Sequence, residues 1–170
     1  MVVIAERAVE IATWAVSKGL KAMKVKVGIE PAADIERVKA VRAAIGPNIR
    51  LGIDANGGWS VRTAIPCIRR LTEECNIFFA EQPTSAVDLQ WLVDVRRNVS
   101  VPVMADESCY TVQDAIAIVR ASAADILSVY IGKGGLGPAR KVAAVAEGAG
   151  LTCTVGSNLE LGIASAAMAH

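Results

Sequence analysis

The sequence is poor in aromatic residues and has no regular cysteine pattern. Only 4% of its 170 residues are aromatic, whereas 53% are hydrophobic, which predicts aliphatic strands beneath alanine-rich helices in a single core. The four cysteines, Cys67, Cys75, Cys109 and Cys153, show no CxxC spacing. They therefore predict no disulfide framework, and they suit a reducing compartment as free packing thiols.

The sequence also lacks a block of basic charge, a membrane-length apolar run and a signal-peptide pattern. The net charge of +1 comes from scattered residues, which argues against a nucleic-acid surface. The first fifteen residues carry Glu6 and Glu10 where a signal peptide has basic residues before an apolar stretch. No apolar run is long enough to cross a membrane. We therefore expect a cytoplasmic protein that acts on a small molecule, without nucleic acid or membrane as a partner.

Short apolar runs that end on a polar residue recur along the chain. Three of them end on acids, at Asp54, Glu81 and Asp106, and two further strands are expected to lead to Lys26 and Lys133. Successive intervals between these five positions are 28, 27, 25 and 27 residues, and each interval accommodates one strand, one helix and two loops. This period predicts parallel strands that alternate with helices, with the polar residues gathered at one rim, as in a (β/α)8 barrel.

The expected elements add up to a partial barrel in one domain over residues 1–170. The predicted strands cover 20–27, 49–54, 77–81, 101–105, 125–131 and 151–155. The predicted helices cover 6–17, 32–45, 60–71, 85 or 88 to 98, 111–122, 138–148 and 158–170. The fold class is therefore α/β, a TIM-like barrel with about six parallel strands where closure requires eight.

Three carboxylates at one rim repel each other unless a cation lies between them. Hard oxygen ligands suit Mg²⁺, or Mn²⁺ in its place, so Asp54, Glu81 and Asp106 are candidate metal ligands. The alternative is that each acid is an ordinary helix cap or loop residue, which is credible for one of them and weak for three in register.

Lys24 and Lys26 lie two residues apart on one strand and therefore face the same side. Unpaired ammonium groups are costly to bury, so two lysines aimed into a barrel, with Lys133 nearby, point to chemistry. A desolvated lysine beside other cations can be neutral and can remove a proton from carbon. The alternative is that Lys24 or Lys26 reaches solvent and pairs with an acid.

These strand ends resemble the C-terminal barrel domain of the enolase superfamily, specifically the muconate lactonizing enzyme subgroup. The similarity covers nearly the whole chain. The motifs that carry it are Lys24-Val25-Lys26, Asp54-Ala55-Asn56, Glu81-Gln82-Pro83, Ala105-Asp106-Glu107-Ser108 and Lys133-Gly134-Gly135. A lysine at 133 and no histidine near the end of the seventh barrel strand separate the chain from the mandelate racemase subgroup, and His170 lies too far along to replace one.

The resemblance implies a Mg²⁺-dependent enzyme that removes a proton α to a carboxylate. Lys26 and Lys133 would be acid/base groups on opposite faces of the substrate, and Lys24 would lower the pKa of Lys26. If both lysines exchange protons, the enzyme is a racemase or epimerase. If one only protonates or stabilises, it is a cycloisomerase or a lyase. Asn56 and Glu107 would orient the metal ligands, and Glu160 resembles the acid after the seventh strand.

The sequence departs from this family in what it does not contain. It has no segment that matches the family's capping domain or the first and eighth barrel strands, so we expect two unpaired sheet edges and association into a homo-oligomer. One alternative is therefore a truncated, weakly active or inactive barrel that binds metal. A more remote alternative is a dinucleotide-binding oxidoreductase, since residues 132–137 match GxGxxG, although on a late strand and without the acid that should follow.

Overall fold

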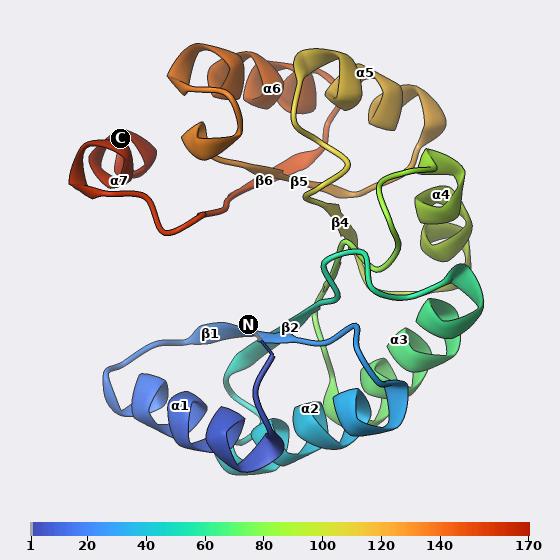
Figure 1. The fold of residues 1–170 in the computed structure, drawn as a ribbon, viewed down its shortest axis with the longest axis vertical. Coiled ribbons are helices and arrows are strands. Elements are labelled where there is room, and N and C mark those ends of the chain that lie inside the picture. Colours follow the sequence, from blue (N-terminus) through green and yellow to red (C-terminus); the bar gives the residue numbers. More distant parts are fainter. Residues whose placement is uncertain (1) are drawn as a thin grey trace.

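The computed structural model describes residues 2–170, which form one curved parallel sheet with helices along it (Figure 1). Six strands lie in the order β1 to β6, and each pairs in parallel with the next. The strands are β1 (Ala22–Lys26), β2 (Arg50–Asp54), β3 (Ala80–Glu81), β4 (Val103–Ala105), β5 (Ile126–Val129) and β6 (Thr152–Val155). The predicted α/β partial barrel is confirmed.

Helices α1 to α6 follow the convex side of the sheet, whereas α7 lies apart, beside the opening between the two sheet edges (Figure 1). They are α1 (Ala5–Ser17), α2 (Pro31–Ile45), α3 (Val61–Cys75), α4 (Leu89–Asn98), α5 (Val112–Ala121), α6 (Leu136–Gly148) and α7 (Gly162–Ala169). A short 3-10 turn, η1 (Ile131–Lys133), follows β5. Within residues 2–170 we find no helix that is both long and apolar enough to cross a membrane.

Side-chain caps set where several helices begin. Ser60 accepts a hydrogen bond from the backbone N–H of Thr63 at the start of α3, and Asp88 accepts one at the start of α4. At α5, Thr111 and Asp114 each accept a backbone N–H from the other, which satisfies two donors that the helix leaves free. These caps terminate the loops that leave the rim, so they help to hold the strand ends in place.

The core lies between the sheet and the outer helices. Leu51, Ile53 and Leu127 from the strands are almost completely buried, as are Ile68 and Leu92 from α3 and α4. Burial of aliphatic side chains of this size stabilises the fold by about 1.5–3 kcal/mol each. This layer of aliphatic contacts gives the polar rim a rigid base.

Several predicted boundaries were wrong in ways that the packing explains. Helix α3 continues past Leu71 to Cys75, because Cys75 extends the buried stripe by one turn. The run 77–81 pairs as a strand only at Ala80–Glu81, although Phe78 still donates its backbone N–H to Leu51. The last helix begins at Gly162 instead of residue 158 and buries none of its residues.

The strand register brings the predicted site residues side by side. Lys26 lies opposite Asp54, and Asp54 lies opposite Glu81. Lys133 does not extend a strand as predicted, because β5 ends at Val129 and the lysine lies in the turn η1. Strands β1 and β6 are the two edges of the sheet, so the barrel is open between them.

Candidate active site

Two lysines of β1 converge on one carboxylate at the end of β2. The Nζ atom of Lys26 lies 2.6 Å from Oδ2 of Asp54, and the Nζ atom of Lys24 lies 2.9 Å from the same oxygen. Asp54 is fully buried, whereas each lysine side chain is about one third exposed. Burial alone would raise the pKa of Asp54, but the two ammonium groups outweigh it and hold that pKa below its ordinary value. Asp54 is therefore ionised at neutral pH.

Glu81 carries the opposite perturbation. The residue is 4% exposed, and its carboxylate lies beside the charges of Asp54 and Asp106. Burial and these neighbouring carboxylates raise the pKa of Glu81 to about 7, although Lys24 donates to its Oε2 at 2.7 Å and opposes the shift. Burial lowers the pKa of Lys24, but Asp54 and Glu81 outweigh it and leave that pKa raised. Negative charge is therefore in excess around Glu81.

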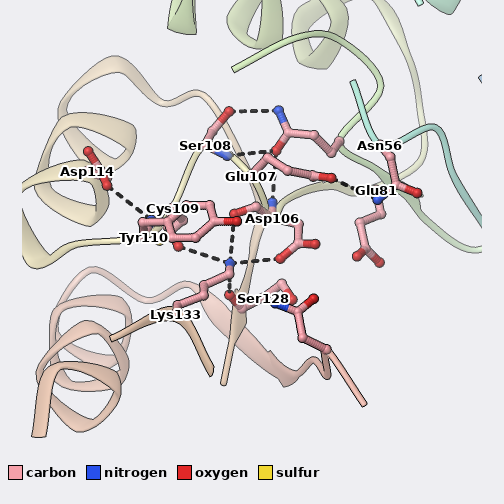
Figure 2. A network of polar contacts seen from close by, with 12 residues as sticks. Asn56, Glu81, Asp106, Glu107, Ser108, Cys109, Tyr110, Asp114, Ser128 and Lys133 are labelled. Carbon is pink, nitrogen blue, oxygen red and sulfur yellow. Dashed lines mark hydrogen bonds and ion pairs between the residues drawn. The ribbon is translucent and has the colours of Figure 1, made fainter. Parts of the chain in front are cut away.

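Lys133 lies in the turn η1 after β5, and its side chain points toward Asp106 (Figure 2). Its Nζ atom lies 2.7 Å from Oδ1 of Asp106 and donates to the carbonyl oxygens of Asp106, Cys109 and Ser128 at 2.7, 3.0 and 2.7 Å. The side chain is 5% exposed, and its ammonium lies 5.3 Å and 4.9 Å from the ring centroids of Tyr110 and Tyr130. The structure therefore holds Lys133 far more tightly than Lys26.

Asn56 and Glu107 connect the loops after β2 and β4. Asn56 Oδ1 accepts from Lys26 Nζ at 2.6 Å. Asn56 Nδ2 donates to Glu107 Oε1 at 2.8 Å (Figure 2). The backbone N–H of Asn56 also donates to Oδ1 of Asp54, in a turn with a positive φ that asparagine tolerates. Both residues thus contact the site, and their predicted orienting role stays a prediction.

Glu160 lies beside Gly132 in the turn η1, and its hydrogen-bond partners belong to its own loop. Its carboxylate accepts from Ser157 Oγ at 2.6 Å and from the backbone N–H of Asn158. The hydrogen bond from Ser157 lowers the pKa of Glu160. A side chain at Gly132 would meet Oε1 of Glu160 at 2.5 Å, so the glycine lets this loop approach the turn of Lys133. The catalytic role of Glu160 stays a prediction.

The donor set fits a hard divalent cation. The carboxylates of Glu81 and Asp106 point into the same space (Figure 2). Oε2 of Glu107 is buried and accepts no hydrogen bond from any group in residues 2–170, whereas the buried Oδ1 of Asp106 faces the Lys133 ammonium at 2.7 Å. Unpartnered anionic oxygens are costly to bury, and they are the ligands that Mg²⁺ prefers. Within those residues, however, no three acidic, cysteine or histidine side chains converge closely enough to hold a metal as they stand.

The sequence reasoning assigned no role to three residues that the structure places in the site. Gln82 is fully buried behind Glu81, and its side chain contacts the loop after β4. A polar amide at the end of an otherwise apolar run was the available signal. Tyr110 and Tyr130 flank Lys133, and their signal was weaker, since only their rarity in this sequence distinguishes them.

Comparisons with known proteins place these residues in a family. The family model described as Enolase C-terminal domain-like matches residues 6–170. The L-Ala-D/L-Glu epimerase of Clostridium acetobutylicum is 39% identical over 158 residues, which are 92% of this chain and 44% of that protein. Other relatives are named as an N-succinyl-L-Arg/Lys racemase and a muconate cycloisomerase.

Solved structures agree with this assignment. A substrate-liganded complex of the L-Ala-D/L-Glu epimerase from Bacillus subtilis superposes with a TM-score of 0.96 at 33% identity, covering 99% of this chain and 48% of that one. The dipeptide epimerase from Enterococcus faecalis, complexed with Mg and the dipeptide L-Leu-L-Tyr, gives a TM-score of 0.95 at 35% identity, covering 99% and 48%. The chain thus spans about half the length of these relatives. It belongs to the enolase C-terminal domain-like family.

Proposed function

We propose that this chain is the barrel portion of a Mg²⁺-dependent isomerase that removes a proton α to a carboxylate. The observation that carries the proposal is the placement of two lysines at separate carboxylates. Lys26 Nζ contacts Asp54, and Lys133 Nζ contacts Asp106 from a different element. The relatives named as epimerases, racemases and a cycloisomerase support the same reaction class. The dinucleotide-binding alternative gains no support from them.

Asp54, Glu81 and Asp106 are the residues that would hold the cation. When bound, it would neutralise the negative charge that develops on the substrate carboxylate. Lys26 Nζ would accept the α-proton on one face, and Lys133 Nζ would donate a proton on the other. Asp54 and Asn56 orient Lys26 at 2.6 Å each, whereas three carbonyl oxygens and Asp106 orient Lys133. Whether one or both lysines exchange protons then decides between cycloisomerisation and epimerisation.

The substrate that fits best is a small carboxylate of dipeptide size. A cavity of about 290 Å³ opens on the concave side of the sheet, lined by residues that include Lys24, Glu81, Met104 and Ser128. The Enterococcus faecalis relative was solved with Mg and a dipeptide. We further propose a cytoplasmic location, which four free cysteines favour, and a homo-oligomer that covers the edges β1 and β6.

Isotope exchange tests the function directly. L-Ala-L-Glu is incubated with the protein in D₂O, with and without Mg²⁺, and deuterium at each α-carbon is followed by ¹H NMR. Mg²⁺-dependent exchange that is lost in both Lys26→Ala and Lys133→Ala would support epimerisation. Exchange that survives Lys133→Ala would support one-base chemistry. Mn²⁺ binding without exchange of any dipeptide and without turnover of muconate would instead favour the inactive metal-binding barrel, an alternative that the open edges β1 and β6 support.

A further inference from the structure

The side chain of Gln82 is a buried connection between the ends of three strands. It is fully buried, directly after Glu81 at the end of β3. Its backbone has a φ of 33°, a left-handed conformation that is unusual for glutamine. Its own backbone N–H donates to Met104, and its carbonyl oxygen accepts from Gly57 after β2. A buried polar residue in a strained backbone conformation is retained only where the surrounding contacts compensate for the strain.

All four hydrogen-bonding positions of the Gln82 amide are used. Nε2 donates to the carbonyl oxygen of Thr84 at 2.8 Å and to Ser108 Oγ at 2.7 Å. Oε1 accepts from the backbone N–H groups of Asp106 at 2.9 Å and Ser108 at 3.0 Å. Figure 2 shows Ser108 and Asp106 on the loop that these contacts hold. A fully satisfied buried amide fixes the position of every group it contacts.

The hydrogen bond between Gln82 and Asp106 affects two groups of the proposed active site. Asp106 carries a candidate metal-ligating carboxylate next to Glu81, and its carbonyl oxygen accepts from Lys133 Nζ at 2.7 Å. A shift of the Asp106 backbone would therefore move both the carboxylate and the lysine. Since Gln82 follows Glu81 directly, one amide sets the spacing between the two carboxylates and Lys133.

We infer that Gln82 is a positioning residue that fixes Asp106, and through it Lys133, relative to Glu81. The inference rests on the proposed function because it assumes the metal site. The hydrogen bonds of Gln82 are present whether or not a metal binds. Gln82→Met keeps the shape of the side chain and removes all four hydrogen bonds. Residues that orient metal ligands typically change metal affinity by about 10- to 100-fold when they are lost. We expect a loss of Mn²⁺ affinity in that range.

Mn²⁺ titration monitored by electron paramagnetic resonance measures the affinity, and two controls separate positioning from general damage. Gln90→Met makes the same chemical change on the exposed side of α4, and Val95→Ala weakens the core without touching the site. Both should bind Mn²⁺ like the unchanged protein. A Gln82→Met protein that also binds like the unchanged protein would overturn the inference.

A second readout does not depend on metal. Lys133 is 5% exposed and Lys26 is 33% exposed, so limited acetylation followed by mass spectrometry should modify Lys26 first. Gln82→Met should raise the acetylation rate of Lys133 severalfold relative to that of Lys26, and an unchanged ratio would overturn the inference. If the unchanged protein binds no Mn²⁺, the proposed metal site fails, and this ratio alone decides the role of Gln82.

Hydrogen exchange decides the case in which Gln82→Met does not fold. In the unchanged protein, the amides of Asp106 and Ser108 should exchange as slowly as the β2 amide of Ile53, because both donate to a buried oxygen. Exchange at the rate of exposed loop amides would overturn the inference.

Discussion

The ion pair between Asp34 and Arg37 should be the most sensitive polar contact outside the rim. Asp34 is fully buried and accepts from the backbone N–H groups of Gly28 at 2.8 Å and Ile29 at 3.1 Å. Arg37 is 8% exposed, donates to Asp34 at 2.7 Å and also donates to the carbonyl oxygens of Val3 and Lys26. The pair thus ties helix α2 to the loop that follows Lys26.

The expected cost of Asp34→Ala follows from these contacts. Removing one partner of a buried ion pair leaves an uncompensated charge and costs about 3–5 kcal/mol in unfolding free energy. Here the substitution leaves the Arg37 guanidinium without its anion and two backbone N–H groups without an acceptor. For a chain of this length each kcal/mol shifts Tm by about 2–4 °C, so we expect a decrease of about 6–20 °C.

Circular dichroism at 222 nm measures the shift, with all variants at one protein concentration and one heating rate. The Tm of Asp34→Asn should lie between those of the unchanged protein and Asp34→Ala, because asparagine keeps an acceptor oxygen and loses the charge. Glu74→Ala is the matched control: Glu74 pairs with Lys39 at 2.9 Å and Arg70 at 2.6 Å on the surface, where ion pairs are screened and contribute little. If Asp34→Ala melted within about 2 °C of this control, the reasoning on the buried pair would be refuted.

Three further predictions concern the site, the cysteines and the open edges. Lys26→Ala should abolish α-proton exchange on its own face of the substrate, while the Mg²⁺ affinity measured by calorimetry stays nearly unchanged. Lys24→Ala should shift the pH profile of the exchange upward. Equal loss of metal binding in both variants would mean that the lysines only hold the site together. Iodoacetamide at pH 8 should alkylate the exposed Cys153 first, because burial raises the pKa of Cys109 to about 11 and leaves roughly one Cys109 thiol in a thousand as thiolate. The alkylation rate of Cys109 should rise with pH up to that value, and early labelling of Cys109 by mass spectrometry would contradict its burial. The 170-residue chain should aggregate or dimerise across β1 and β6, and its turnover should be far slower than that of a full-length relative. A monodisperse monomer in light scattering, with the activity of a full-length relative, would show this prediction wrong.

The order of the elements and their common rim could be predicted from the sequence because both depend on local patterns. Apolar runs of strand length and helical stripes repeat with a period near 27 residues, and parallel strands joined by helices end at the same edge. That is why Lys26, Asp54 and Glu81 lie opposite one another as the register requires. Residue type and spacing were enough for this part of the site.

The pairing of side chains, in contrast, was decided by the tertiary structure. Nothing local to Gln82 indicates that its amide contacts Ser108, 26 residues away, and nothing near residue 133 indicates that its lysine leaves the strand and lies among three carbonyl oxygens. These contacts depend on how neighbouring βα units pack against each other. Strand periodicity specifies on which face and at which end of a strand a residue lies. A hydrogen bond needs its donor and acceptor within about 3 Å, and that distance is set only when the loops of several βα units meet.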